Sequence, residues 1–359
     1  MRGLSSAAAF GVLMAGLLAC APEEVFVGSF DDPLGTPTLD PLWSQGPARL
    51  DDVVAFGDRV AVVYALEDGH YLSLVDRAGE AETFRVSNPL DTLRGAVQPL
   101  DDDRYRYVWQ NHFRRADWSA FASEQRIGEA VDVRAAFLLS SEVEEAIGPE
   151  IAPHPLGSVV AFRSRAGVSL RFVGFDGSYR LIADFFPGHR LGSADRLLVD
   201  GDRGWLVTRA QGEARLHLVD LEAGGWFEQS LGEASAADVA LSAFGPLLAV
   251  STATASSLSR LVPRGPTQFE RASTVSVFDG SMGRLQMAAD DAGWIVAATA
   301  GGTLGVHVAC GRTPEGVTHS GDTGVVGSRL ALVSHGGRRF LAVGGEDEMV
   351  QLFAVRCAD

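Results

Sequence analysis

Residues 193–231 read SADRLLVDGDRGWLVTRAQGEARLHLVDLEAGGWFEQSL, and this stretch decides the fold. It holds four short apolar runs, at residues 196–200, 205–209, 214–220 and 226–231. The segments between them are rich in Gly, Asp, Glu and Gln, which suits turns. The pattern predicts four short strands joined by turns.

Looser copies of this unit recur along almost the whole chain, spaced by about 45 residues, the size of a β-propeller blade. The apolar residues that mark the second strand of each copy are Val60, Tyr105, Val159, Trp205, Leu247, Trp294 and Phe340. We therefore expect an all-β fold, a single β-propeller of seven four-stranded blades over residues 51–359, with six or eight blades as alternatives. Tandem immunoglobulin-like sandwiches would repeat at about 100 residues instead.

The third copy resembles a known repeat. Residues 149–162 read PEIAPHPLGSVVAF and residues 176–181 read DGSYRL. This unit is similar to the WD40-like repeat of TolB-type propellers, which usually carry Ser-Pro-Asp-Gly where this chain has His-Pro-Leu-Gly. The resemblance covers one unit of the chain and implies a propeller fold, without implying a partner.

The last copy supplies only three strands, at residues 329–333, 339–343 and 349–356. A propeller leaves no open sheet edge when a strand from the other end of the chain completes the last blade. We expect that strand to come from residues 25–30 or from the region of Trp43.

The N-terminal sequence predicts an export signal. Arg2 precedes an apolar run from Ala7 to Ala19, as in a secretory signal peptide. Leu17-Leu18-Ala19-Cys20 resembles the lipobox of bacterial lipoproteins, in which the cysteine is lipidated after cleavage just before it. This resemblance implies a signal peptide at 1–19, lipidation of Cys20 and, with Ala at position 21, an outer-membrane location. Ordinary secretion with cleavage after Ala21 is the alternative.

Residues 20–50 are rich in proline, at positions 22, 33, 37, 41 and 47. This density disfavours regular structure, so we expect an extended tether between the lipidated Cys20 and the propeller.

The charge balance excludes several functions. The chain carries 46 acidic and 30 basic residues, for a formal net charge of −16, which opposes nucleic acid and anionic surfaces. Every basic residue among the 30 is arginine. Without lysine, Schiff-base catalysis and a phosphate-binding P-loop are excluded.

No motif predicts catalysis, a metal site or a cofactor. The 8 histidines form no close-set ligand pair. Asp322-Thr323-Gly324 is similar to the aspartic protease triplet, but it occurs once and is followed by Val325, so a turn between blades is expected. Neither a nucleophile elbow nor a dinucleotide fingerprint is present.

Two further features are candidate site residues. Cys310 and Cys357 occupy similar positions in the last two copies, so they form either a disulfide, which an oxidising compartment allows, or two buried thiols.

Residues 104–118 read RYRYVWQNHFRRADW. Tyr105, Tyr107 and Trp109 alternate on one face of a strand and should pack between blades. Arg114, Arg115 and Trp118 follow in a loop, as a candidate partner surface or as a solvated basic loop.

Together these features predict a lipid-anchored binding or scaffold protein of the bacterial cell envelope, non-catalytic, whose partner is an envelope protein or a small ligand. The alternative is a propeller hydrolase or lyase that acts on glycans or lactones at the central channel. Repeated Asp or His side chains around the channel would favour the enzyme, and an apolar or scattered lining would favour binding.

Overall fold

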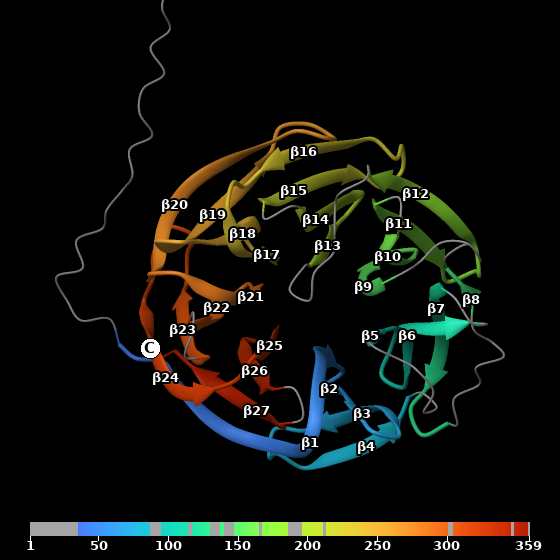
Figure 1. Cartoon of the computed structure of the whole chain (residues 1–359), viewed down its shortest axis with the longest axis horizontal. Coiled ribbons are helices and arrows are strands. Elements are labelled where there is room, and N and C mark those ends of the chain that lie inside the picture. Colours follow the sequence, from blue (N-terminus) through green and yellow to red (C-terminus); the bar gives the residue numbers. More distant parts are fainter. Residues whose placement is uncertain are drawn as a thin grey trace, which may run out of the picture.

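A computed structural model of the chain describes residues 35–86, 95–113, 117–129, 137–139, 147–164, 167–185, 196–210, 213–300, 304–345 and 348–357. These residues form strands, turns and loops, and none of them belongs to a helix long and apolar enough to cross a membrane. The strands form small sheets arranged radially around a central axis (Figure 1).

Seven blades make up the ring, because the 7-stranded sheet consists of two blades that share β1. Blade 1 contains residues 49–56 of β1 (Thr38–Phe56), β2 (Arg59–Leu66), β3 (Gly69–Val75) and β4 (Ala81–Arg85). Blade 2 contains β5 (Gly95–Pro99), β6 (Arg104–Phe113), β7 (Asp117–Arg126) and β8 (Phe137–Leu138). Blade 3 contains β9 (Ile147–His154), β10 (Gly157–Ser164), β11 (Gly167–Gly174) and β12 (Tyr179–Phe185).

The other blades follow the same order. Blade 4 contains β13 (Leu197–Asp200), β14 (Arg203–Ala210), β15 (Glu213–Asp220) and β16 (Trp226–Ser230). Blade 5 contains β17 (Ala234–Ser242), β18 (Gly245–Thr252), β19 (Ala255–Pro263) and β20 (Phe269–Asp279). Blade 6 contains β21 (Met282–Asp290), β22 (Gly293–Ala300), β23 (Gly305–Gly311) and β24 (His319–Val326). Blade 7 contains β25 (Arg329–His335), β26 (Arg338–Gly344), β27 (Glu348–Arg356) and residues 38–48 of β1.

The predicted β-propeller is confirmed. All seven anchor residues lie on the second strand of a blade, and the four strands predicted in residues 193–231 are β13 to β16. In the unit that resembles the TolB-type repeat, residues 149–162 lie on β9 and β10, and residues 176–181 lead into β12. Gly57 and Gly201 sit in the turn between the first two strands of their blades with φ of 58° and 59°, a left-handed conformation that favours glycine.

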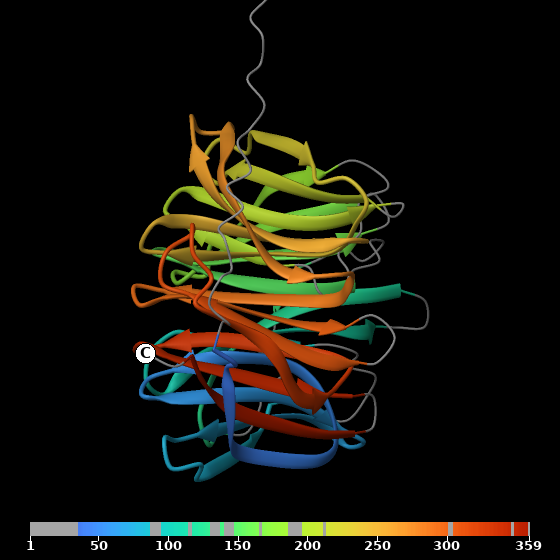
Figure 2. The same cartoon turned by 90° about the vertical axis from the view of Figure 1, so that its left-hand side faces the viewer.

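The N-terminal strand closes the ring, as predicted. Residues 38–48 of β1 pair with β27, with Trp43 opposite Leu352, and the same strand then continues as the first strand of blade 1. Figure 2 shows this part of β1 beside the red strands of blade 7. The boundary expected between tether and propeller at residues 50 and 51 therefore falls inside β1. Residues 25–30, the other candidate for closure, lie outside the described residues.

Proline did not prevent this strand because of where it lies. Pro41 and Pro47 stand in the outermost strand of blade 7, next to shifts of register between residues 41 and 43 and between residues 45 and 48. Edge strands and bulges tolerate proline, since no partner needs the missing N–H there. Within residues 38–48, the prolines therefore belong to an edge strand rather than to a tether.

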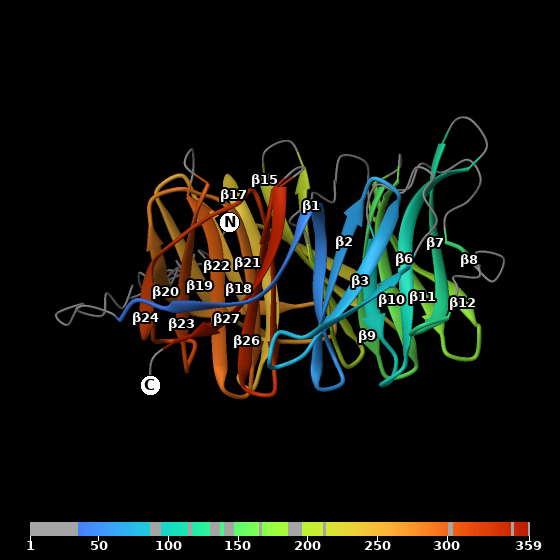
Figure 3. The same cartoon turned by 90° about the horizontal axis from the view of Figure 1, so that it is seen from below.

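The core is divided among the gaps between blades. Each of seven apolar clusters combines residues from two neighbouring blades, including the pair of blades 7 and 1. The sheets are buried on both faces, so the consecutive residues Ala61, Val62 and Val63 are all fully buried. In the side view of Figure 3, the strands run between two faces of the ring that carry the turns and loops.

Candidate functional site

A channel follows the axis of the ring, lined by the first strand of every blade. It encloses about 520 Å³, and most of its lining is Val, Leu, Ala, Pro and Met. Its charged residues are Asp52 from blade 1, Glu150 from blade 3 and Arg196 just before β13. These charges are scattered rather than repeated, and no histidine occurs among the described lining residues.

Arg196 is the cation that interacts electrostatically with the acidic residues at the channel. Burial alone lowers the pKa of its guanidinium, but attraction from Asp238, Asp52 and Glu150 outweighs burial, so the pKa is raised. Arg196 therefore remains a cation among three carboxyl groups. A cation held in this way balances charge within the fold.

Asp238 in β17 is one of these carboxyl groups, and its pKa is shifted far from the usual value. It is fully buried, and burial raises its pKa to about 7 against the opposing attraction of Arg196. Its two oxygens accept hydrogen bonds from the backbone N–H of Val239 and of Met287, each 2.7 Å long. Met287 lies in β21, so Asp238 ties blade 5 to blade 6. A carboxyl group without exposed surface cannot contact a substrate in the channel, so we interpret it as structural.

The described part of the chain also offers no metal centre. No group of three or more His, Cys, Asp or Glu residues there lies close enough to hold a metal ion. Asp322-Thr323-Gly324 lies within β24, the outer strand of blade 6, and not in the expected turn between blades. There the Asp322 carboxylate accepts a hydrogen bond of 2.9 Å from the Gly324 N–H.

The candidate partner surface is only partly described. Arg114 and Arg115 lie outside the described residues. Trp118 lies on β7 opposite His112, although its side chain is not among those described. The strand before them behaves as expected, since Tyr105, Tyr107 and Trp109 are buried between blades 1 and 2.

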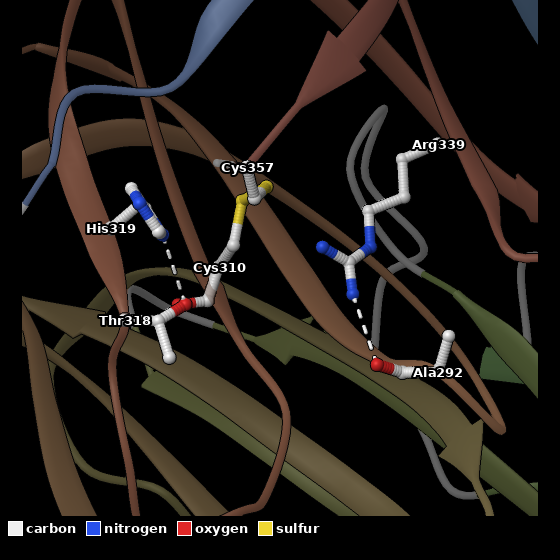
Figure 4. Close-up of a disulfide and its surroundings, with 6 residues drawn as sticks. All are labelled: Ala292, Cys310, Thr318, His319, Arg339 and Cys357. Carbon is white, nitrogen blue, oxygen red and sulfur yellow. Dashed lines mark hydrogen bonds between the residues drawn. A yellow bond between two sulfur atoms is a disulfide. The ribbon is translucent and has the colours of Figure 1, made fainter. Parts of the chain in front are cut away.

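Cys310 and Cys357 form a disulfide, shown in Figure 4, with their Cα atoms 6.2 Å apart. Cys310 belongs to β23 of blade 6, and Cys357 follows β27 of blade 7 directly. The bond therefore fastens the end of the chain to the neighbouring blade, next to the strand that closes the ring. The candidate lipidation site, Cys20, lies outside the described residues.

A larger cavity, of about 860 Å³, opens beside this disulfide at the seam between blades 6 and 7. We call it the arginine cavity, because its lining contains Arg77, Arg312, Arg338, Arg339 and Arg356. No pattern in the sequence predicts this cavity. These arginines are spread over most of the chain, and only Arg338 and Arg339 are adjacent, so no local pattern signals that they meet.

Comparison with known proteins gives the fold alone. No family model and no curated protein sequence matches this chain. The propeller domain of Cps50 (Swd1) from Myceliophteria thermophila is similar in structure, with a TM-score of 0.54 and 13% identity over 86% of this chain and 100% of that domain. The CNH domain of AfRom2 is similar at a TM-score of 0.54 and 11% identity, covering 90% of this chain and 100% of its own.

The chain also overlaps a prolyl endopeptidase structure, at 13% identity and a TM-score of 0.49. The overlap spans 83% of this chain but only 47% of that one, less than half of its length. At such identities a structural match identifies a shared architecture and says nothing about ligands or chemistry.

Proposed function

We propose that the protein is a non-catalytic binding protein of the bacterial cell envelope, held by a lipid on Cys20 and recognising its partner with the propeller. The observation that carries the proposal is the central channel. Its lining is mostly apolar, and its charges, Asp52, Glu150 and Arg196, come from different blades without repetition. The hydrolase or lyase alternative needs repeated carboxylates or histidines, and nothing among the described lining residues favours it.

The lipid anchor is supported by the lipobox resemblance at residues 17–20. Two or three acyl chains are sufficient for stable anchoring in a membrane. The disulfide between Cys310 and Cys357 also fits an exported protein, because such bonds persist in oxidising compartments. With Ala at position 21, the same resemblance supports an outer-membrane location.

The partner is an envelope protein or a small ligand, since the net charge of −16 opposes nucleic acid. Arg114, Arg115 and Trp118 remain our candidate for the contact surface with a protein, because Arg and Trp are enriched among residues that dominate binding energy.

Affinity purification of the full-length protein from detergent-solubilised membranes of its native host tests this proposal. The wild type should recover a specific partner, and Cys20→Ala should recover much less, because it no longer concentrates the propeller at the membrane. Equal recovery by both forms would show that partner binding does not depend on a lipid at Cys20. If neither form recovers a partner or ligand, the binding function is wrong.

A companion variant tests the surface. Replacing Arg114, Arg115 and Trp118 together with alanine should lower partner recovery at least about tenfold, as expected for hot-spot residues. Arg126→Ala with Arg264→Ala is the matched control, since both side chains are 58% exposed and lie on blades 2 and 5. Recovery that is unchanged in the triple variant would assign the contact to another surface.

A further inference from the structure

The arginine cavity lies where several turns of one face meet. Ala292 lies in the turn between β21 and β22, Gly337 in the turn between β25 and β26, and Arg77 in the turn between β3 and β4. Arg312 and Arg356 come from the ends of β23 and β27. The chain thus brings guanidinium groups from blades 1, 6 and 7 to one concave site.

The site is positively charged on a negatively charged protein. Its lining contains five arginines and one acidic residue, Asp40, whereas the whole chain carries −16. At physiological ionic strength, charges are screened beyond about 8 Å, so the local potential is set by the five arginines, opposed by Asp40 in the lining and by Asp290 near Arg339. An anion that reaches the cavity is therefore attracted to it.

These arginines differ in the partners that the protein gives them. Arg356 forms an ion pair with Asp40, with 2.5 Å between Nε and Oδ2. Arg77 and Arg338 are exposed, and neither forms an ion pair with any described residue. Like charges gathered in this way repel one another, and a bound anion would relieve that repulsion.

Arg339 is the most enclosed member. Its Nη2 donates a hydrogen bond of 3.4 Å to the carbonyl of Ala292, as Figure 4 shows, while its buried Nε has no hydrogen-bond partner in the described part of the structure. Burial lowers the pKa of this guanidinium, Asp290 opposes the effect and Arg312 adds to it.

Gly293 gives Arg339 the room for this position. A Cβ at Gly293, where φ is 132°, would stand 3.0 Å from Nη2 of Arg339 and 2.2 Å from the carbonyl oxygen of Gly311. Any larger residue would be strained by its backbone and would press on the guanidinium.

We propose that the arginine cavity binds a small ligand that carries phosphate groups. The planar guanidinium donates pairs of parallel hydrogen bonds that match phosphate oxygens. A diphosphate supplies about three negative charges near neutral pH in a compact volume, against five arginines and one aspartate in the lining, whereas a carboxylate supplies one per group. This site goes beyond the proposed function, because it requires neither a lipid on Cys20 nor a protein partner.

Isothermal titration calorimetry of the detergent-solubilised full-length protein with inorganic pyrophosphate tests the proposal. The wild type should bind pyrophosphate, and its affinity should fall as sodium chloride is raised. Arg77→Gln with Arg338→Gln should weaken binding at least about tenfold, because each charge-assisted contact to phosphate is worth about that factor. Both side chains are exposed, so the fold should be unaffected, which the melting temperature checks.

The matched control is Arg126→Gln with Arg264→Gln, which removes the same charge from exposed positions on blades 2 and 5. Its affinity for pyrophosphate should equal that of the wild type. Two results would overturn the proposal. One is that the wild type shows no binding at about 10 mM pyrophosphate, a concentration that would detect even a weak site. The other is that both double variants lose affinity for pyrophosphate to the same extent.

Competition identifies the source of the phosphate. Pyrophosphate is titrated into protein in detergent micelles with and without phosphatidylglycerol. A weaker apparent affinity in the presence of the lipid assigns the cavity to a phospholipid head group. An unchanged affinity assigns it to a soluble phosphate compound, and both results support a phosphate site.

Discussion

Trp43, in the part of β1 that belongs to blade 7, packs against Tyr64 of blade 1 with their ring centroids 5.6 Å apart. Tyr64 in turn stacks on Tyr71 of the next strand, at 5.9 Å. The strand that closes the ring is therefore held by a side-chain contact to the first blade as well as by its backbone pairing with β27.

Removing this strand should destabilise the whole propeller. Deletion of residues 21–48 takes away the half-buried Leu39, Leu42 and Trp43 and exposes the edge of β27. We expect a loss of at least about 2 kcal/mol in the free energy of unfolding, since each large apolar side chain contributes about 1.5–3 kcal/mol when fully buried and about half of that when half-buried. Urea unfolding measures it. Deletion of residues 21–34, which leaves β1 complete, is the control and should unfold like the full-length chain. Equal stability of both truncations would mean that β1 does not close the ring.

A single substitution should show the same effect on a smaller scale. Trp43→Ala removes the contact with Tyr64 but leaves the backbone pairing intact, so we expect a loss of about 1–3 kcal/mol, below the cost for a fully buried Trp. Thermal melting compares it with Trp43→Phe, which keeps an aromatic ring and should lose less. If Trp43→Ala melts like the wild type, the aromatic contact contributes nothing to closure.

The disulfide should contribute measurably to stability. It joins residues 47 positions apart, for which the loss of loop-closure entropy predicts about 4 kcal/mol. Cys310→Ala with Cys357→Ala should therefore lower the free energy of unfolding by about 2–5 kcal/mol. Reduction with dithiothreitol should destabilise the wild type by a similar amount and leave the double variant unaffected. If dithiothreitol lowered the free energy of unfolding of both proteins equally, the loss would not come from this disulfide.

Asp238 should give the fold an unusual dependence on pH. Burial raises its pKa from 3.8 to about 7 in the folded protein, so between about pH 4 and 7 the folded state keeps a proton that the unfolded state has lost. The contribution of Asp238 to the free energy of unfolding therefore falls as the pH rises from about 4 to 7, and it is constant above pH 7. The full effect is at most about 4 kcal/mol.

Asp238→Asn tests this dependence, because asparagine does not titrate. Its side chain can accept only one of the two N–H hydrogen bonds from Val239 and Met287, so we expect the variant to be less stable by about 1–3 kcal/mol at pH 5. This gap should narrow at pH 8, where the wild type must bury a charge. Urea unfolding at both pH values gives the difference, and a gap that is independent of pH would show that Asp238 is already ionised at pH 5.

The repeat made the architecture predictable. Gly57 and Gly201 mark the same turn in two blades, and an apolar residue such as Trp205 or Trp294 follows a turn of this kind. The local sequence pattern therefore predicts each blade. The position of the closing strand was half predicted. Trp43 pointed to it, but Pro41 and Pro47 favoured a tether, because only the folded ring shows that this strand lies at an edge.

The sites depend on contacts that no local pattern carries. Cys310 and Cys357 come within bonding distance only because two blades are adjacent at the seam. Asp238 has its unusual pKa because the ring buries it, and Arg77 meets Arg338 only when blade 7 has closed against blade 1. Arg114 and Arg115, which the sequence made prominent, lie outside the described residues.

The lipid on Cys20 is the central claim and has a direct test. Cells of the native host that express the full-length wild type or Cys20→Ser are labelled with an alkyne-bearing fatty acid and separated into membrane and soluble fractions. We predict label on the wild type, which should sediment with the outer membrane, and no label on Cys20→Ser, which should be recovered outside the membrane fraction. A wild-type protein that is soluble and carries no label would contradict the account.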